Sequence, residues 1–265
     1  MKKKLTIYNI LLAFFALVFA VSSFFLIREL VTRRIASEYV TSLQSEYVPT
    51  IPTSPAAGSH QPETDSETGE PLPPATLEQV DTSNPTIQKL VSKYPDVVGW
   101  LTVAGANVSH PFVRADDNAK YLWTDLDGKY INGGTLFMDC INTVDMSDKI
   151  TVIYGHNMRN GSMFGQLLNY LDFDYLMENQ DVYISFPDYT AHYKAVACFI
   201  VDGADNIIFD SIGERGDIQD VVDFIYESTQ VDSACELNGD SSLLVLSTCH
   251  RSYYTARTLL ICIPD

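Results

Sequence analysis

Hydrophobic and polar positions change their spacing along the chain, and the first pattern is a continuous apolar run. Residues 5–27 carry no charge and follow three consecutive lysines. About 20 apolar residues suffice to cross a bilayer as a helix. We therefore predict a transmembrane anchor over residues 5–27, with residues 1–4 as a cytoplasmic tail. A cleaved signal peptide is the alternative, but its apolar core is usually only about 7–15 residues long.

The next segment has no apolar periodicity. Residues 35–88 contain no lysine or arginine, and residues 54–74 contain no aromatic side chain but several prolines. A segment of this composition has too little apolar surface to bury, and its prolines keep it extended. We predict a largely disordered extracellular linker over residues 28–83. Residues 35–48 are compatible with a short helical continuation of the anchor.

Periodic patterns return at residue 84 and continue to residue 265, which we predict to be one folded domain. Helical spacing begins near Asn84, with Pro85 in the first turn, and recurs over residues 162–171 and 217–228. Strand-like runs fall within residues 99–113, 149–157, 180–202, 241–249 and 257–263. Many short strands with a few interrupting helices favour a β-barrel or sandwich over a parallel α/β sheet.

Charge and composition narrow the function classes. The apolar fraction of 46% is typical of a globular protein, and the formal net charge is −17. Nucleic-acid binding requires a basic surface, so this charge argues against nucleic acid as a partner. Basic residues are concentrated before residue 35, which leaves the remaining chain strongly acidic.

Five cysteines are present, and an odd number in an exported chain leaves at least one thiol unpaired within the chain. No cysteine or histidine spacing is typical of a zinc site. Cys198 and Cys262 lie inside apolar strands, where small buried thiols are common. Cys140 and Cys235 lie near loops. Cys249 differs, because it ends an apolar strand and polar residues follow it, which predicts a side chain that emerges at a barrel rim.

A reactive thiol needs a neighbouring base or cation. His156 ends the apolar run "TVIYGHN", so it is also expected to emerge at a strand end. His250 adjoins Cys249, but successive strand side chains point to opposite faces. His110 and His192 are expected to be packed or solvated rings. Taken alone, His156 is more often a structural hydrogen-bonding residue, whereas its pairing with Cys249 favours a catalytic role.

Two motifs make the pattern specific. The stretches "YGHNMRNGSMFGQL" and "LSTCHRSYYTAR" together resemble the class B sortases, and "YPDVVGWL" and "DNAKYLWTDLDGKYINGGTLFMD" fit the same family. The resemblance covers about residues 84–265. It implies a mainly β fold, a sortase-type closed β-barrel with a few peripheral helices, preceded by the transmembrane helix. It also implies a membrane-bound cysteine transpeptidase of Gram-positive bacteria, with the catalytic domain outside the cell.

The resemblance further implies roles for individual residues. Cys249 matches the nucleophile, His156 the general acid and base, and Arg257 the arginine beside the thiol. Ser247 and Thr248 match the substrate-binding residues before the nucleophile. The helix at 217–228 corresponds to the insertion of class B members. The resemblance implies neither a cofactor nor a metal, calcium included.

The choice between two arginines rests on strand geometry. Arg251 is nearer to Cys249 in sequence, but it is expected in the connecting loop. Arg257 opens the last strand, so it can converge with Cys249 across one rim. Arg257 shares strand parity with Leu259 and Ile261, and we expect all three on the inner face of the barrel.

The partners implied by the resemblance are exported proteins that bear a C-terminal sorting signal, and an amine of a peptidoglycan precursor or a pilin as acceptor. The lipid bilayer is the partner of the N-terminal helix. Two other classes stay open. An L,D-transpeptidase is also anchored and barrel-like, but is expected to carry His and Gly directly before its cysteine, where this chain has Ser247 and Thr248. A non-catalytic surface binding module would leave His156, Cys249 and Arg257 unexplained.

Overall fold

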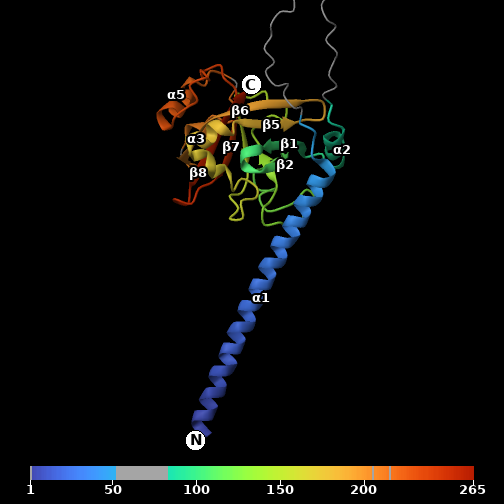
Figure 1. Ribbon diagram of the computed structural model, residues 1–265, viewed down its shortest axis with the longest axis vertical. Helices are drawn as coiled ribbons and strands as arrows, with labels where there is room; N and C mark the ends of the chain where they lie inside the picture. The colour runs from blue at the N-terminus through green and yellow to red at the C-terminus, as the bar shows by residue number, and fades with distance from the viewer. Residues whose placement is uncertain (1, 52–82, 205, 215) are drawn as a thin grey trace, which may run out of the picture.

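A computed structural model describes residues 2–51, 83–204, 206–214 and 216–265, with side chains described from residue 7 onward. The chain forms a head from which one long helix, α1 (Lys2–Tyr47), extends as a rod (Figure 1). With 46 residues, α1 is about 70 Å long at about 1.5 Å per residue. The N-terminus lies at the far end of the rod, and the C-terminus lies on the head (Figure 1).

The head is a closed barrel of eight strands in the order β1-β2-β3-β4-β7-β8-β6-β5. The strands are β1 (Val97–Val103), β2 (Val108–Val113), β3 (Leu136–Met138), β4 (Ile150–Tyr154), β5 (Asp181–Ser185), β6 (Thr190–Asp202), β7 (Leu243–Cys249) and β8 (Ala256–Pro264). The β2–β3 and β4–β7 pairs are parallel, and the other pairs are antiparallel. The predicted closed barrel with peripheral helices is confirmed.

Strand alternation divides the apolar residues of the barrel between two cores. Leu244 and Leu246 of β7 lie in the core that draws on every strand, which is the barrel interior. Leu243 and Val245 lie in a second core on the outer face. Helices α4 (Ile207–Asp210) and α5 (Gln219–Ser228) cover that face. Helix α5 is the helix predicted over residues 217–228.

One predicted helix is wrong. The segment 162–171 forms turns followed by the 3-10 helix η2 (Leu167–Leu171), and the α-helix α3 (Phe173–Glu178) starts only afterwards. Met163 has φ +53° and forms an isolated bridge with Asn157, which an α-helix does not permit. Asp172 caps α3 by accepting hydrogen bonds from the backbone N–H groups of Asp174 and Tyr175. A second 3-10 turn, η1 (Ala104–Ala106), joins β1 to β2.

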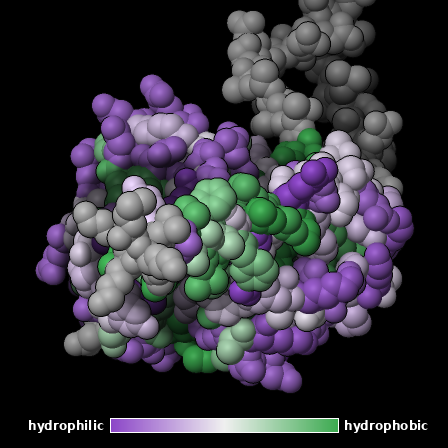
Figure 2. All heavy atoms as spheres, turned by 90° about the horizontal axis from the view of Figure 1, so that it is seen from below, coloured by the Kyte–Doolittle hydropathy of each residue, from purple (hydrophilic) through white to green (hydrophobic). Residues whose placement is uncertain are grey.

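Residues 7–27 of α1 carry mostly apolar side chains on all sides, and nearly all of them are exposed. The helix is long and apolar enough to cross a membrane, and its apolar window is not buried against the head. Seen from below, hydrophobic side chains gather over α1, whereas the head around it is mostly hydrophilic (Figure 2). An exposed apolar surface of this size is typical of an interaction site, and its length suffices to span a bilayer.

The second half of α1 is amphipathic and docks on the head. Residues 28–47 belong to the predicted linker, but α1 runs through them, in agreement with the helical continuation expected over residues 35–48. The last turns of α1 pack beside α2 (Pro85–Lys93). The shielded positions recur at helical spacing and are Ala36, Tyr39, Val40, Leu43, Gln44 and Tyr47. Leu43 and Tyr47 join a third core with Trp100 of β1. Residues 52–82 of the predicted linker lie outside the described residues, and the domain boundary at residue 84 stays a prediction.

Candidate active site

The pairing of β4 with β7 brings His156 and Cys249 to the same edge of the barrel. The two strands run parallel, with Tyr154 opposite Ser247 at their ends. The pairing continues one residue beyond β4, where the Gly155 N–H donates to the Ser247 carbonyl at 3.1 Å. His156 then leaves β4 at the level where β7 ends in Cys249.

Cys249 and Arg257 are direct neighbours across the β7–β8 pair. Residues directly opposite in an antiparallel pair point to one face, with Cβ atoms about 4.5–5.5 Å apart. The expected face is wrong, however. Leu259 and Ile261 lie in the outer core under α5, so the parity that Arg257 shares with them places it on the outer face. Arg257 and Cys249 lie on the same face of the sheet in either case, because they are directly opposite each other.

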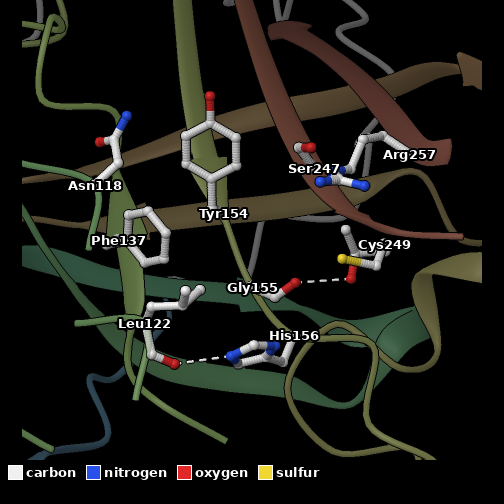
Figure 3. Close-up of a pocket in the computed structure, with 10 residues that line it drawn as sticks. Asn118, Leu122, Phe137, Tyr154, Gly155, His156, Ser247, Cys249 and Arg257 are labelled. Atoms are coloured by element: carbon white, nitrogen blue, oxygen red, sulfur yellow. Dashed lines mark hydrogen bonds between the residues drawn. The ribbon is translucent and has the colours of Figure 1, made fainter. Parts of the chain in front are cut away.

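Backbone carbonyl oxygens hold the Arg257 side chain, and the absence of a side chain on Gly203 leaves space for it. One terminal guanidinium nitrogen donates to the Ala256 carbonyl at 3.0 Å and to the Tyr254 carbonyl at 3.4 Å. A Cβ on Gly203 would lie only 2.7 Å from Arg257 Cγ, so glycine leaves the room that the stem occupies. The guanidinium is directed over the pocket near Ser247 and Cys249 (Figure 3).

His156 is held from outside the barrel by the 121–135 hairpin. Its Nε2 is 2.8 Å from the Leu122 carbonyl oxygen, and the Trp123 ring lies 4.4 Å from the imidazole, centroid to centroid. A carbonyl oxygen can only accept a hydrogen bond, so Nε2 carries a proton. In the neutral ring Nδ1 is therefore the free acceptor. The ring stands between Leu122 and Cys249 (Figure 3).

Two hydrogen bonds tie the His156 loop to β7. Thr248 Oγ1 donates to the Gly155 carbonyl at 2.7 Å. The Asn157 side-chain amide donates to the Cys249 carbonyl at 2.8 Å. Both bonds bridge segments about 90 residues apart in sequence. They fix the backbone on either side of His156 relative to the backbone of Cys249.

These residues line one open pocket with a volume of about 190 Å³. Its walls are Asn118, Leu122, Phe137, Tyr154, Gly155, His156, Ser247, Thr248, Cys249 and Arg257 (Figure 3). All five residues predicted for the site are therefore brought together, whereas Arg251 is not among the residues that line it. The Ser247 hydroxyl is buried and has no hydrogen-bond partner among the described residues.

A polar network supports the wall opposite Cys249. The Tyr154 hydroxyl donates to Asp139 Oδ2 at 2.9 Å, and the Asn118 amide donates to the same oxygen at 2.8 Å. Burial and the Asp139 carboxylate raise the pKa of Tyr154 above its ordinary value, so the phenol stays a neutral donor. The backbone N–H of Cys140 in turn donates to Asn118 Oδ1 at 2.8 Å.

The five cysteines are all free, and Cys249 alone among them is exposed. Burial raises the pKa of the Cys198 and Cys262 thiols, which keeps them protonated. Burial and the nearby Asp232 carboxylate raise the pKa of Cys235. Of the thiols in the described chain, Cys249 is the one that is both accessible and beside a histidine ring and a guanidinium.

The other described histidines lie away from the pocket walls. His110 is buried in β2, and burial lowers its pKa to about 4. His192 is in contact with the carboxylates of Asp181 and Asp265 at 2.9 Å each. His250 Nδ1 is 3.0 Å from the Ser252 hydroxyl. These are the packed and solvated positions expected from the sequence.

Sequence reasoning missed the residues that hold His156. Leu122 and Trp123 fall in the stretch "DNAKYLWTDLDGKYINGG", which shows turn signals but no periodicity that would place it over a histidine about 34 residues later. Asn118, Phe137 and Tyr154, which line the same pocket, were also missed. An exposed tryptophan in a polar turn is the one local signal, since a large apolar ring in a loop usually has a contact to make.

Comparison with known proteins gives two kinds of match. No family model matches the chain. Sortase B of Listeria monocytogenes is 30% identical over 156 residues, which are 58% of this chain and 63% of the relative. The match thus spans less than two thirds of that protein's length.

Solved structures match over more of the chain. A crystal structure of sortase B from B. anthracis in complex with AAEK1 superimposes with a TM-score of 0.66 at 21% identity, covering 89% of this chain and 98% of that one. A Streptococcus pyogenes class B sortase involved in pilus biogenesis has a TM-score of 0.61 at 25% identity, over 67% of this chain and 97% of that one. The resemblance to class B sortases is confirmed, and the barrel has the fold of these sortase B structures.

Proposed function

We propose that this protein is a membrane-anchored cysteine transpeptidase of the class B sortase type. The observation that carries the proposal is the meeting of Cys249, His156 and Arg257, from three strand ends, in one pocket. The likeness to class B sortases in sequence and fold supports the same activity. The substrate is an exported protein with a C-terminal sorting signal, which the enzyme cuts, holds as a thioester and passes to an amine.

In the first half-reaction, the Cys249 thiolate attacks the carbonyl carbon of the scissile peptide bond. The C–N bond then breaks, and the departing amine takes a proton from the His156 imidazolium. Because Nε2 is bonded to the Leu122 carbonyl, Nδ1 is the nitrogen that delivers this proton. The products are a thioester on Cys249, a free amine and a neutral imidazole.

We propose that Arg257 binds the substrate oxygen at this step. A guanidinium held by backbone carbonyls keeps further N–H donors for the oxyanion of the tetrahedral intermediate. Preorganised donors of this kind stabilise the transition state more than the ground state. Ser247 also lines the pocket, and its proposed contact with the substrate requires the buried hydroxyl, which has no partner among the described residues, to become accessible.

In the second half-reaction, an acceptor amine attacks the thioester carbonyl. His156 Nδ1 takes the proton from the attacking amine, the C–S bond breaks, and the Cys249 thiolate is restored. An open pocket suits this sequence, because the leaving peptide and the acceptor must use the same side of the thioester in turn. The proposed acceptors are an amine of a peptidoglycan precursor or of a pilin.

The proposed topology is a single pass through the cell membrane, with the head outside. The first half of α1 supplies the span, and residues 1–4 remain on the cytoplasmic side. An L,D-transpeptidase has less support, since neither the residues before Cys249 nor the comparisons favour it. A binding module without catalysis gives no reason for an exposed thiol between a fixed imidazole and a fixed guanidinium.

The test is an acceptor-dependent transfer reaction. The full-length protein in detergent micelles is incubated with a library of sorting-signal peptides and a small amine acceptor, and the products are identified by mass spectrometry. We expect cleavage at one position of a preferred motif, and transfer of the N-terminal fragment to the amine. The proposal would be contradicted if iodoacetamide alkylates Cys249, which shows that the thiol is accessible, but the protein cleaves no peptide in the library.

A further inference from the structure

The docked half of α1 faces the two segments that hold His156 across a second pocket. Residues 33–41 of α1 form one wall of this pocket. The opposite walls are residues 131–134, which end the 121–135 hairpin, and residues 158–163, which follow His156. Helix α1 therefore faces, across this pocket, both segments that place the imidazole.

The 121–135 hairpin is a connected unit, so a contact at one point constrains the whole. The Thr135 N–H donates to the Tyr121 carbonyl at 3.0 Å, and the Ile131 N–H donates to the Trp123 carbonyl at 2.9 Å. The base of this unit carries Leu122, whose carbonyl binds His156. Gly134 sits at φ +56° with the Leu122 carbonyl 2.4 Å from where a Cβ would lie, so the two backbones are in close contact.

Tyr39 of α1 makes the polar link to this hairpin. Its hydroxyl accepts a hydrogen bond from the Leu126 N–H at 3.0 Å. Burial raises the pKa of Tyr39, which marks the contact as shielded from water. Leu126 is buried in the same core as Leu43 and Tyr47 of α1. Polar and apolar contacts thus fasten the turn of the hairpin to the helix, and the base of the hairpin to His156.

We propose that Tyr39 is a positioning residue for His156, acting through the Leu126 N–H and the 121–135 hairpin. The proposal rests on the proposed function, because it assigns His156 a role in proton transfer. If so, α1 helps to position His156 in addition to tethering the head. A helix that only tethers would need no contact with the hairpin that holds His156.

The test compares two tyrosine-to-phenylalanine variants on the same helix. Tyr39→Phe keeps the packed ring and removes the hydroxyl that binds Leu126. Tyr47→Phe is the control, because the Tyr47 ring belongs to the same core as the partly buried Tyr39 ring but lies beneath the Lys89 ammonium of α2, 5.4 Å from the ring centroid. Both full-length variants and the parent are assayed in micelles with the peptide that the parent cleaves best. Alkylation of Cys249 by iodoacetamide and hydrogen exchange of residues 121–135 are measured alongside.

We expect Tyr39→Phe to lower kcat about 3- to 10-fold with KM unchanged, the size of effect expected from one neutral hydrogen bond. Exchange in the 121–135 hairpin should become faster, while the alkylation rate of Cys249 stays at the parent value. Tyr47→Phe should stay within twofold of the parent in kcat. The alkylation and exchange measurements are made at a temperature where all three proteins are folded, as judged by their thermal transitions.

Equal kcat for Tyr39→Phe and the parent would overturn the proposal, and so would an equal loss in Tyr47→Phe. A fall in the alkylation rate of Cys249 that matches the fall in kcat would also overturn it, because the effect would then be general and not specific to His156. Failure of the parent to cleave any peptide would instead reject the proposed function, so the two failures are distinct.

Discussion

Cys249 and Arg257 sit on neighbouring strands of a closed barrel, whereas His156 sits on a loop that leaves it. The strand residues face each other because the β7–β8 register places them opposite. The loop residue depends on a hydrogen bond from its ring, on an aromatic contact, and on a hairpin that α1 contacts. One half of the pocket is fixed by backbone pairing and the other by contacts between distant segments. Substitutions outside the pocket are therefore expected to act mainly on the histidine half.

The largest expected effect among these comparisons comes from removing proton transfer while keeping the contact that orients it. In His156→Gln the amide nitrogen can still donate to the Leu122 carbonyl, but the side chain cannot shuttle a proton. We expect kcat/KM for peptide cleavage to fall about 10²- to 10⁴-fold, the usual contribution of a positioned general acid. Alkylation of Cys249 by iodoacetamide should persist. A loss of less than tenfold would remove His156 from the reaction.

The strand half is tested by the two arginines. Arg257→Ala should lower kcat/KM about 10²- to 10³-fold, as loss of one oxyanion donor does elsewhere. Arg257→Lys should stay badly impaired, because lysine keeps the charge but not the planar fork. Arg251→Ala is the control in the connecting loop and should lose less than about tenfold. Steady-state kinetics of the three variants decide the matter, and a crippled Arg251→Ala beside a near-normal Arg257→Ala would reverse the assignment.

A smaller effect is expected where the hairpin meets the imidazole. Trp123→Ala removes the ring that lies 4.4 Å from His156. Aromatic contacts of this kind are worth about 0.5–1.5 kcal/mol, so kcat should fall about 2- to 10-fold. Trp123→Phe retains an aromatic face and should recover most of the rate. If Ala and Phe behave alike, the ring does not orient His156.

Some of the features behind these predictions could be predicted from the sequence, and others could not. The strands with clear alternation, the helix α5 and the emergence of Cys249 and His156 at strand ends follow from local periodicity. Arg257 was placed beside Cys249 by strand order, although the inner face assigned to it was wrong. That error arose because both faces of β7 and β8 are buried, one inside the barrel and one under α5. An all-apolar strand does not reveal which face is inside.

The histidine half was not predictable in the same way. The contacts of Leu122 and Trp123 with His156 join segments that have no shared pattern in sequence. The docking of α1 did leave a signal, since Ala36, Tyr39, Val40, Leu43 and Tyr47 recur at helical spacing within the predicted linker. The segment was assigned to the linker because residues 35–88 lack basic residues and contain several prolines. The helical continuation over residues 35–48 was expected, but its docking on the head was not.

The smallest expected effect on activity comes from replacing His110, the buried histidine of β2. Burial lowers the pKa of His110 to about 4, against about 6.5 in the unfolded chain. Below pH 6.5 the unfolded chain binds a proton that the folded chain does not, so the free energy of unfolding falls as the pH falls from about 6.5 to about 4. This difference is worth about 3 kcal/mol over the whole window. Chemical denaturation of His110→Leu should show a shallower loss across that window than the parent, with unchanged kcat; parallel curves would contradict the assignment.

The central claim is that Cys249 carries the acyl group. Mass spectrometry of the enzyme trapped during turnover tests this claim most directly. The full-length protein is mixed with its preferred peptide, quenched in acid and digested, so that the acylated residue can be located. We predict an adduct with the mass of the N-terminal peptide fragment on Cys249, which hydroxylamine releases. Cys249→Ala should form no adduct while its thermal transition is retained, and Ala at Cys140, Cys198, Cys235 or Cys262 should leave the adduct in place. Normal peptide cleavage by Cys249→Ala, or an adduct on another residue, would contradict the account.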